Sequence, residues 1–263
     1  MEMGGRTVRQ IGKYNKMYYD KQDIRYINTL RWSGVLFTAC EALLLDGHTA
    51  QARKLLNLFL AARGVAGVSE DLDDWDEKTK NRIIELSQNP KVIGIGEIGL
   101  DYHYRNDNKE KQKHVFVEQL KLAHMLKLPV SIHNRDSIGD LLEILKANKH
   151  LLEFGGVIHC FSESPEIFRE IKKLGLKIGF GGTLTFKNSV TAPLVCKECD
   201  MTDFLIETDC PYLAPEPFRG KLNEPKYTTY IAQKIGLIKG VSYDTVVDQA
   251  KKNALEIFKK VNL

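Results

Sequence analysis

From residue 90 onward, short runs of apolar residues alternate with longer stretches in which apolar residues recur at helical spacing. The short runs lie at residues 92–95, 130–132, 156–158, 177–180 and 204–206. They lack the polar alternation of a strand that faces water on one side, and strands buried on both faces have this pattern. Such strands occur mainly in parallel sheets covered by helices, so the alternation predicts repeated strand–helix units.

The longer stretches predict helices at residues 109–127, 136–148, 164–174, 227–235 and 242–261. In the first of them Val115, Phe116 and similar residues form an apolar stripe, with lysine and glutamate on the opposite face. Pro129 is expected to stop this helix before the next strand. Ser164 and Ser242 are predicted N-caps, since a serine oxygen can accept from an unpaired N–H of the first turn.

The first third of the chain repeats this alternation less regularly. Strands are expected at residues 8–11, 35–39 and 65–68, and helices at 23–32, 50–62 and 77–87. With the later elements this makes eight strands and eight helices, uninterrupted by a linker or low-complexity segment. A length of 263 residues is usual for one α/β barrel. The sequence therefore predicts an α/β fold in which residues 1–263 form a single (β/α)₈ TIM barrel domain.

Four side chains that can bind a metal follow predicted strands directly, namely Glu97, His133, His159 and Asp209. Taken singly, such a histidine or glutamate is more often a hydrogen-bonded structural residue. In a barrel, however, the carboxyl ends of the strands meet at one mouth, where active sites are built. Two imidazoles and two carboxylates suit Zn²⁺, Mn²⁺ or Mg²⁺, and Glu97 can bridge two ions. The sequence therefore predicts a site for one or two divalent metal ions at this mouth.

Several cations lie close to these segments. Arg135 follows His133 by two residues, and its planar guanidinium can bind a phosphate through two hydrogen bonds. Arg219 and Lys221 come after the last predicted strand, where the alternative interpretation is a solvated basic loop. Beside a metal site, all three are predicted to bind substrate phosphates. The glycine-rich segment 179–183 is a weaker phosphate candidate, because glycines also simply form turns.

The composition indicates the cellular compartment of such an enzyme but does not identify its substrate. A formal charge of +4 is compatible with a polyanionic partner but does not require one. Five cysteines without framework spacing favour a reducing compartment, and the lone pair Cys196 and Cys199 favours two thiols on a short helix over a zinc site. Neither a long apolar run nor a signal-peptide pattern occurs, so we expect a cytoplasmic protein.

Five segments resemble the signature motifs of TatD-type deoxyribonucleases. They are GEIGLDY at 96–102, IHNRD at 132–136, IHCFS at 158–162, ETDCPYLAP at 207–215 and RGKLNEP at 219–225. The resemblance implies a metal-dependent hydrolase barrel that trims nucleic acid, with DNA as substrate, from the 3′ end. It also implies that Glu97 bridges two cations, that His133 and His159 hold one of them, and that Asp209 serves the other and accepts a proton from the attacking water.

The N-terminal third departs from the family pattern. Members of the family usually carry an H-x-H pair after the first strand, where this chain has Lys13 and no histidine. Many also have H-P-H after the third strand, where this chain has Glu70 and Asp71. The second ion would therefore keep two carboxylates as its protein ligands and be held loosely. The sequence leaves open whether Lys13, His48, Glu70 or Asp71 compensates.

Two alternatives to a nuclease stay open. One is an amide or ester hydrolase on the same scaffold, since a fold does not fix a substrate. Related amidohydrolases carry a metal-bridging lysine after the fourth strand, and the presence of Glu97 at that place favours the nuclease. The other is a catalytically impaired barrel that binds nucleic acid or a partner, which the missing H-x-H pair favours.

Overall fold

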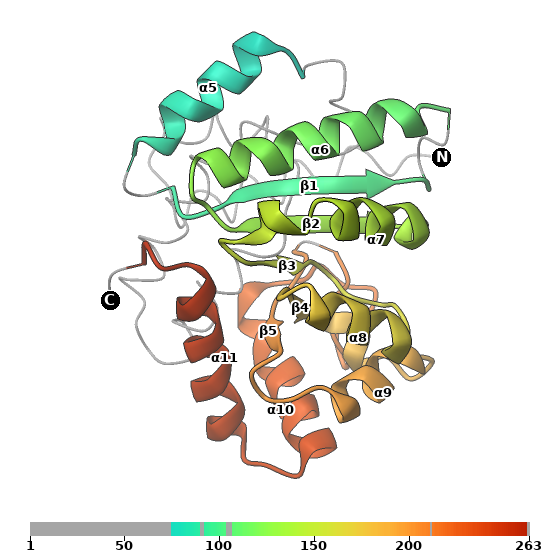
Figure 1. The fold of residues 1–263 in the computed structure, drawn as a ribbon. Helices are drawn as coiled ribbons and strands as arrows, with labels where there is room; N and C mark the ends of the chain where they lie inside the picture. Colours follow the sequence, from blue (N-terminus) through green and yellow to red (C-terminus); the bar gives the residue numbers. More distant parts are fainter. Residues whose placement is uncertain (1–74, 90–91, 104–106, 211, 262–263) are drawn as a thin grey trace. The chain divides into compact units, whose positions relative to one another are not determined.

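Five parallel strands form one sheet, and their order in the sheet follows their order in the chain (Figure 1). The computed structural model describes residues 75–89, 92–103, 107–210 and 212–261. The elements predicted within residues 8–68, together with Lys13, His48, Glu70 and Asp71, lie outside these ranges. The strands are β1 (Ile95–Asp101), β2 (Val130–Arg135), β3 (Gly156–Ile158), β4 (Lys177–Phe180) and β5 (Phe204–Ile206).

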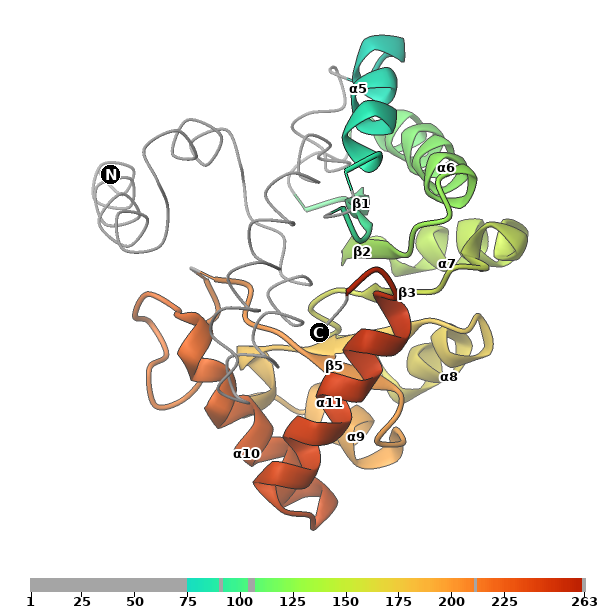
Figure 2. The same ribbon diagram turned by 90° about the vertical axis from the view of Figure 1, so that its left-hand side faces the viewer.

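Helices connect the strands, as parallel pairing requires. The α-helices are α5 (Glu77–Ser87), α6 (Lys109–Met125), α7 (Ile138–Ala147), α8 (Pro165–Lys173), α9 (Thr191–Glu198), α10 (Thr228–Lys239) and α11 (Tyr243–Ile257). Short 3₁₀ helices are η2 (Lys149–Leu152), η3 (Gly182–Thr185) and η4 (Pro225–Tyr227). Helix α6 packs on β1, α7 on β2, α8 on β4 and α11 on β5. In Figure 2, the helices α6, α7, α8 and α9 follow one another in chain order across the sheet, from the side of β1 toward β5.

The core lies between the sheet and these helices. One isoleucine from each strand is at most 2% exposed, namely Ile98, Ile132, Ile158, Ile178 and Ile206. Burial of this kind explains why the strands are continuous apolar runs without polar alternation. The described residues all belong to one compact unit, Trp32–Leu263. The arrangement confirms the α/β class, and the extension of a single domain over residues 1–263 stays a prediction.

The predicted helix starts are confirmed at two serines. The side chain of Ser164 accepts from the N–H of Ile167 at the start of α8, and that of Ser242 accepts from the N–H of Thr245 at the start of α11. Helix α11 ends four residues before the predicted position, at Ile257, and α10 runs four residues further than predicted, to Lys239. None of the helices in the described ranges is both long and apolar enough to cross a membrane.

Two strands extend through residues that the sequence pattern places after them. The pattern predicts β1 at residues 92–95, whereas β1 covers Ile95–Asp101, and β2 continues past Ile132 to Arg135. The cause is a close approach of the two strands at Gly99, which has φ +142° and pairs with His133. A Cβ atom on Gly99 would lie 2.1 Å from the carbonyl oxygen of His133. Glu97 and His133 therefore lie within strands and do not follow them.

The cysteine pair agrees with its predicted environment. Cys196 lies in α9, and Cys199 directly follows the last residue of that helix. Both residues are free thiols and are at most 1% exposed. They pack in the hydrophobic core.

Candidate metal centre

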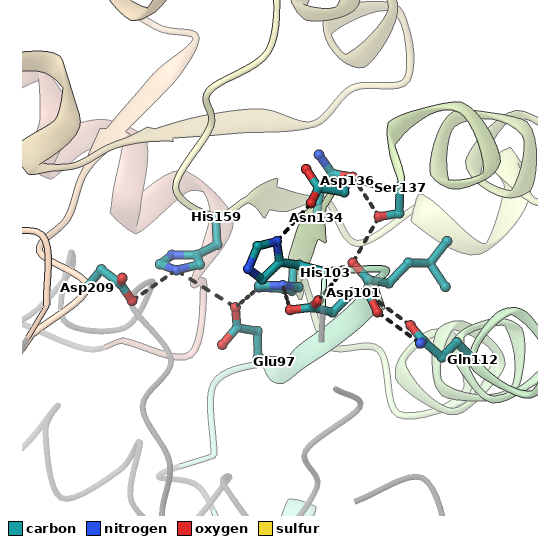
Figure 3. A network of polar contacts seen from close by, with 11 residues as sticks. Glu97, Asp101, His103, Gln112, Asn134, Asp136, Ser137, His159 and Asp209 are labelled. Carbon is teal, nitrogen blue, oxygen red and sulfur yellow. Dashed lines mark hydrogen bonds and ion pairs between the residues drawn. The ribbon is translucent and has the colours of Figure 1, made fainter. Parts of the chain in front are cut away.

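The structure brings together the four predicted residues Glu97, His133, His159 and Asp209. Glu97 lies in β1, His133 in β2, His159 directly after β3, and Asp209 three residues after β5. The Oε1 atom of Glu97 is 3.0 Å from Nδ1 of His133 and 3.8 Å from Nε2 of His159. The same His159 nitrogen is 3.4 Å from Oδ1 of Asp209. In Figure 3, His159 accordingly points between Asp209 and Glu97.

These separations and donor types fit a divalent cation. Two ligand atoms that are each about 2.1 Å from one ion lie roughly 3.0 to 3.4 Å apart. The Glu97–His133 and His159–Asp209 separations fall in this range, and the Glu97–His159 separation is slightly longer. The side chains of His159, Glu97, His133 and Asp209 are 4%, 10%, 20% and 21% exposed, so the cluster is largely buried and His133 and Asp209 are its most accessible members.

A second pair of carboxylates, Asp101 and Glu207, contacts the ring nitrogens of the two histidines that do not face Glu97. Oδ2 of Asp101 lies 3.1 Å from Nε2 of His133, and Oε2 of Glu207 lies 3.0 Å from Nδ1 of His159. Asp101 is 2% exposed and Glu207 is 0% exposed. Each imidazole thus has one nitrogen toward Glu97 and the other on a buried carboxylate. Carboxylates placed in this way fix the orientation of metal-binding histidines and increase their basicity.

Asp101 and Glu207 lie inside the GEIGLDY and ETDCPYLAP motifs, but no pattern in the sequence predicts their contacts with the histidines. Glu207 is held by the turn after β3, where Cys160 has φ +48° and donates its backbone N–H to Oε1 of Glu207. Gly179 in β4 leaves space for the carboxylate, because a Cβ atom there would lie 2.4 Å from it. This glycine therefore makes room for a positioning carboxylate, whereas the sequence suggested a phosphate-binding loop.

Asp101 is anchored by the helix that follows it. Its backbone N–H donates to Oε1 of Gln112 in α6 at 2.8 Å, and Nε2 of Gln112 donates back to its carbonyl at 2.9 Å. The N–H of His103 donates to Oδ1 of Asp101 at 2.9 Å. Ser137, just before α7, donates to the carbonyl of Leu100 at 2.9 Å. This network, drawn in Figure 3, fixes the end of β1 to the starts of α6 and α7.

The carboxylates determine the charge of the two imidazoles. Burial opposes the charged form of His133, but the hydrogen bonds that this form donates to Asp101 and Glu97 outweigh it and raise the pKa of His133 to about 9. Burial also opposes the charge of His159, and the negative charges of Glu207 and Glu97 outweigh it and raise its pKa well above the ordinary value. The pocket therefore favours positive charge strongly, as a cation-binding site does.

A second group of potential ligands overlaps this centre. One ligand atom each of His159, Cys160 and Glu207 lies within 4.8 Å of the others. The two oxygens of Glu207, however, accept hydrogen bonds from Nδ1 of His159 and the N–H of Cys160. Burial also raises the pKa of the Cys160 thiol, which disfavours the thiolate that binds metals. Glu207 therefore fits an orienting role better than a ligand role.

The loop after β5 is closed by Asn223. Its Nδ2 donates to the carbonyls of Thr208 and, at 2.7 Å, Tyr212. Asn223 is 3% exposed, and Asp209 between the two carbonyls takes φ +56°, a left-handed conformation in which aspartate and asparagine are enriched among the residues other than glycine. The NEP part of the last motif thus holds the segment that carries Asp209.

The three predicted phosphate ligands lie on the same segments, with different surroundings. Arg135 ends β2 and is exposed. Arg219 and Lys221 lie in the loop between β5 and η4 and are exposed as well. The guanidinium of Arg219 donates to Oδ1 of Asn188 at 3.0 Å, so its contacts run to the neighbouring loop and not to the four clustered residues. Phosphate binding by these residues stays a prediction.

Comparison with known proteins places the chain in a family. A profile described as TatD related DNase matches residues 14–259. The metal-dependent hydrolase YabD of Bacillus subtilis is 43% identical over 189 residues, which are 72% of this chain and 74% of that protein. The 3'-5' ssDNA/RNA exonuclease TatD of Escherichia fergusonii is 34% identical over 203 residues, or 73% of this chain and 76% of that protein.

A solved structure agrees with this assignment. The crystal structure of YJJV, a TatD homologue from Escherichia coli, superposes with a TM-score of 0.67 at 28% identity, and the match covers 72% of this chain and 73% of that chain. This likeness confirms the predicted fold class, an α/β TIM barrel of the metal-dependent hydrolase type. The chain therefore belongs to the TatD-related DNase family of metal-dependent hydrolases.

Proposed function

We propose that this protein is a divalent-metal-dependent nuclease that hydrolyses phosphodiester bonds of DNA, acting as a 3′–5′ exonuclease on single strands. The observation that carries the proposal is the convergence of Glu97, His133, His159 and Asp209 within hydrogen-bonding or ligand-to-ligand distances. The name of the Escherichia fergusonii relative supports the choice of substrate.

The residues divide into ligands and positioning groups. Glu97 and the two histidines would hold one divalent ion, and Glu97 with Asp209 would contribute to a second. When bound, such an ion supplies Lewis acidity that lowers the pKa of a water and offsets negative charge on the phosphodiester. Asp101 and Glu207 keep the histidines oriented through their second nitrogens.

Two further roles fall to the accessible side chains. Asp209 is the more exposed of the two proposed carboxylate ligands, at 21% against 10% for Glu97. It is therefore placed to accept a proton from the attacking water. Arg135, exposed at the end of β2, and the cations Arg219 and Lys221 would bind the phosphates of the strand.

The test is release of 3′-terminal nucleotides from a 5′-labelled single strand, with Mg²⁺, Mn²⁺ or Zn²⁺ added in turn. We expect metal-dependent release that Glu97→Ala abolishes, because this variant removes the carboxylate oxygen that faces both histidines. The matched control is Glu198→Gln, whose carboxylate pairs with Arg169 on the protein surface and should leave release unchanged.

Three outcomes would contradict the proposal. Unchanged release by Glu97→Ala would sink the site assignment. Absence of release with every metal, from folded protein that still binds the strand, would favour the impaired barrel that the missing H-x-H pair indicates. Turnover of ester or amide substrates without phosphodiester cleavage would favour a different hydrolase on this scaffold.

A further inference from the structure

A planar cation in the loop after β5 lies over an aromatic ring. The guanidinium carbon of Arg219 is 4.3 Å from the ring centroid of Phe186. Its NH1 donates to Oδ1 of Asn188 at 3.0 Å, so the guanidinium is fixed both by the ring and by a hydrogen bond. Arg219 is nevertheless exposed, and Phe186 is half-buried. The pair presents a rigid planar surface, in contrast to a mobile surface cation.

This pair is attached to the segment that carries Asp209. The backbone N–H of Glu216 donates to Oγ1 of Thr185 at 2.8 Å, which links the loop after β5 to η3 just before Phe186. At Gly182, a Cβ atom would lie 1.8 Å from the carbonyl oxygen of Leu213, so the two segments approach with no room for a side chain. The position of the Phe186–Arg219 pair is therefore coupled to the loop that begins at Asp209.

More aromatic side chains and cations extend this surface. The ring of Phe218 stacks on that of Tyr227 with centroids 4.1 Å apart and an interplanar angle of 6°. Lys221 lies over Phe218, with its nitrogen 5.9 Å from the centroid. Among the described residues, neither Arg219 nor Lys221 pairs with a carboxylate, whereas Lys226 is paired with Glu224 at 2.7 Å. Two exposed cations without a carboxylate partner in the described ranges thus lie over the half-buried rings of Phe186 and Phe218.

We propose that the Phe186–Arg219 pair, which is tied to the loop that begins at Asp209, is a stacking site for a nucleobase of a single strand. Proteins that bind single strands combine positive charge for the backbone with planar groups on which bases stack. A guanidinium that lies over a ring and is held there by a hydrogen bond can offer its outer face to a base, and Lys221 is placed to attract the adjoining phosphate. The proposal rests on the proposed function for its substrate class, but it adds contacts to the base that phosphate binding alone would lack.

Binding to two matched oligonucleotides tests the proposal. The probes are a fluorescein-labelled decathymidylate with phosphorothioate linkages, which resist hydrolysis, and an abasic strand of the same length and charge. Fluorescence anisotropy with Mg²⁺ should show that the full-length protein binds the thymidylate about five- to a hundredfold more tightly than the abasic strand. Arg219→Lys keeps the charge and removes the plane, so it should lose most of this ratio. Phe186→Leu should lose it as well.

The control is Arg169→Lys, a charge-conserving change on helix α8 at a surface ion pair, which should keep the ratio. Melting curves establish that each variant is folded. Equal binding of the two strands by the unaltered protein, or an unchanged ratio in both folded variants, would overturn the stacking site. Hydrolysis of bis(4-nitrophenyl) phosphate, which has no nucleobase, tests the proposed chemistry separately. Failure of that hydrolysis alongside an intact thymidylate preference would reject the nuclease and keep the stacking site.

Discussion

At the scale of single residues, the candidate metal centre depends on side chains that do not face the ion. His133 and His159 each have one nitrogen toward Glu97 and the other on a buried carboxylate. Asp101 and Glu207 leave the histidines little rotational freedom, since their own positions are fixed by backbone N–H groups. Removing such a partner typically reduces metal affinity by about ten- to a hundredfold.

Glu207→Gln should therefore weaken metal binding without unfolding the protein. Both oxygens of Glu207 accept hydrogen bonds, one from His159 and one from Cys160. In the glutamine variant an NH₂ group faces one of these donors, so one of the two bonds is lost. We expect isothermal titration calorimetry to show an affinity for Mn²⁺ or Zn²⁺ lower by about ten- to a hundredfold. An affinity equal to that of the unaltered protein would show that Glu207 does not orient His159.

Gly179→Ala should also weaken metal binding, because the added methyl group would displace the carboxylate of Glu207. The new methyl group would lie 2.4 Å from the Glu207 carboxylate, which is fully buried and cannot swing into solvent. We expect a loss of about 1–3 kcal/mol in the free energy of unfolding, measured with urea, together with weaker metal binding. Gly139→Ala in α7 is the matched control, since nothing lies within 4 Å of the added Cβ and alanine favours the helix. Equal stability of the two variants would contradict the crowding argument.

The sequence predicts that the four candidate ligands lie together, but it does not predict the two carboxylates that orient the histidines. The placement of Glu97, His133, His159 and Asp209 near strand ends was sufficient to predict that they meet. The contacts of Asp101 and Glu207 depend on the turn at Cys160 and on the space at Gly179, which come from tertiary packing. No periodicity in a single sequence specifies such turns.

At the scale of elements, the C-termini of α6 and α8 show which residues determine where a helix ends. Helix α8 ends in a Schellman motif, with Gly175 at φ +79° and hydrogen bonds from its N–H to Lys172 and from the next N–H to Ile171. Helix α6 ends in the same motif, but the left-handed residue is Lys127 at φ +56°. Because a lysine rarely adopts this conformation, the sequence predicted a longer helix that Pro129 would stop.

Lys127→Gly should therefore stabilise the protein. Glycine adopts the left-handed conformation without the steric cost that a Cβ atom incurs, and Lys127 is exposed. We expect the free energy of unfolding to rise by about 1 kcal/mol. Gly175→Lys, the reverse exchange in the same motif of α8, should lower it by a similar amount. Urea denaturation measures both, and a destabilised Lys127→Gly protein would contradict this account of the α6 terminus.

The bounds of three strands could be predicted from the local sequence pattern, whereas those of β1 depend on its packing against β2. The bounds of β3, β4 and β5 match the predicted runs, since these strands are short and, apart from Lys177 at the start of β4, without charged or polar side chains. Strand β1 was misplaced because Gly96 and Gly99 resemble loop residues in the sequence. In the structure they allow β1 to approach β2, where a Cβ on Gly96 would lie 2.5 Å from that of Ser131. The same approach places Glu97 beside His133.

At the scale of the whole molecule, the centre is a property of the folded sheet. Its four residues come from β1, from β2 and from the segments that follow β3 and β5, so the unfolded chain does not hold them together. An ion that binds only the folded state stabilises it, by about 2.7 kcal/mol at a concentration one hundred times its Kd. For a domain of this size, about 1 kcal/mol corresponds to a shift of roughly 2–4 °C in Tm.

Thermal unfolding should therefore report the ion independently of any catalysis. We expect Mn²⁺ at one hundred times its Kd to raise the Tm by roughly 5–10 °C over the value in EDTA. Glu97→Ala should lose most of this shift, because Glu97 faces both histidines. Cys160→Ser separates the two overlapping ligand groups, since it removes a thiol only from the group of His159, Cys160 and Glu207. A shift that persists in Glu97→Ala and disappears in Cys160→Ser would move the ion to that second group, whereas the opposite result would place it among the four residues on which the proposed hydrolysis depends.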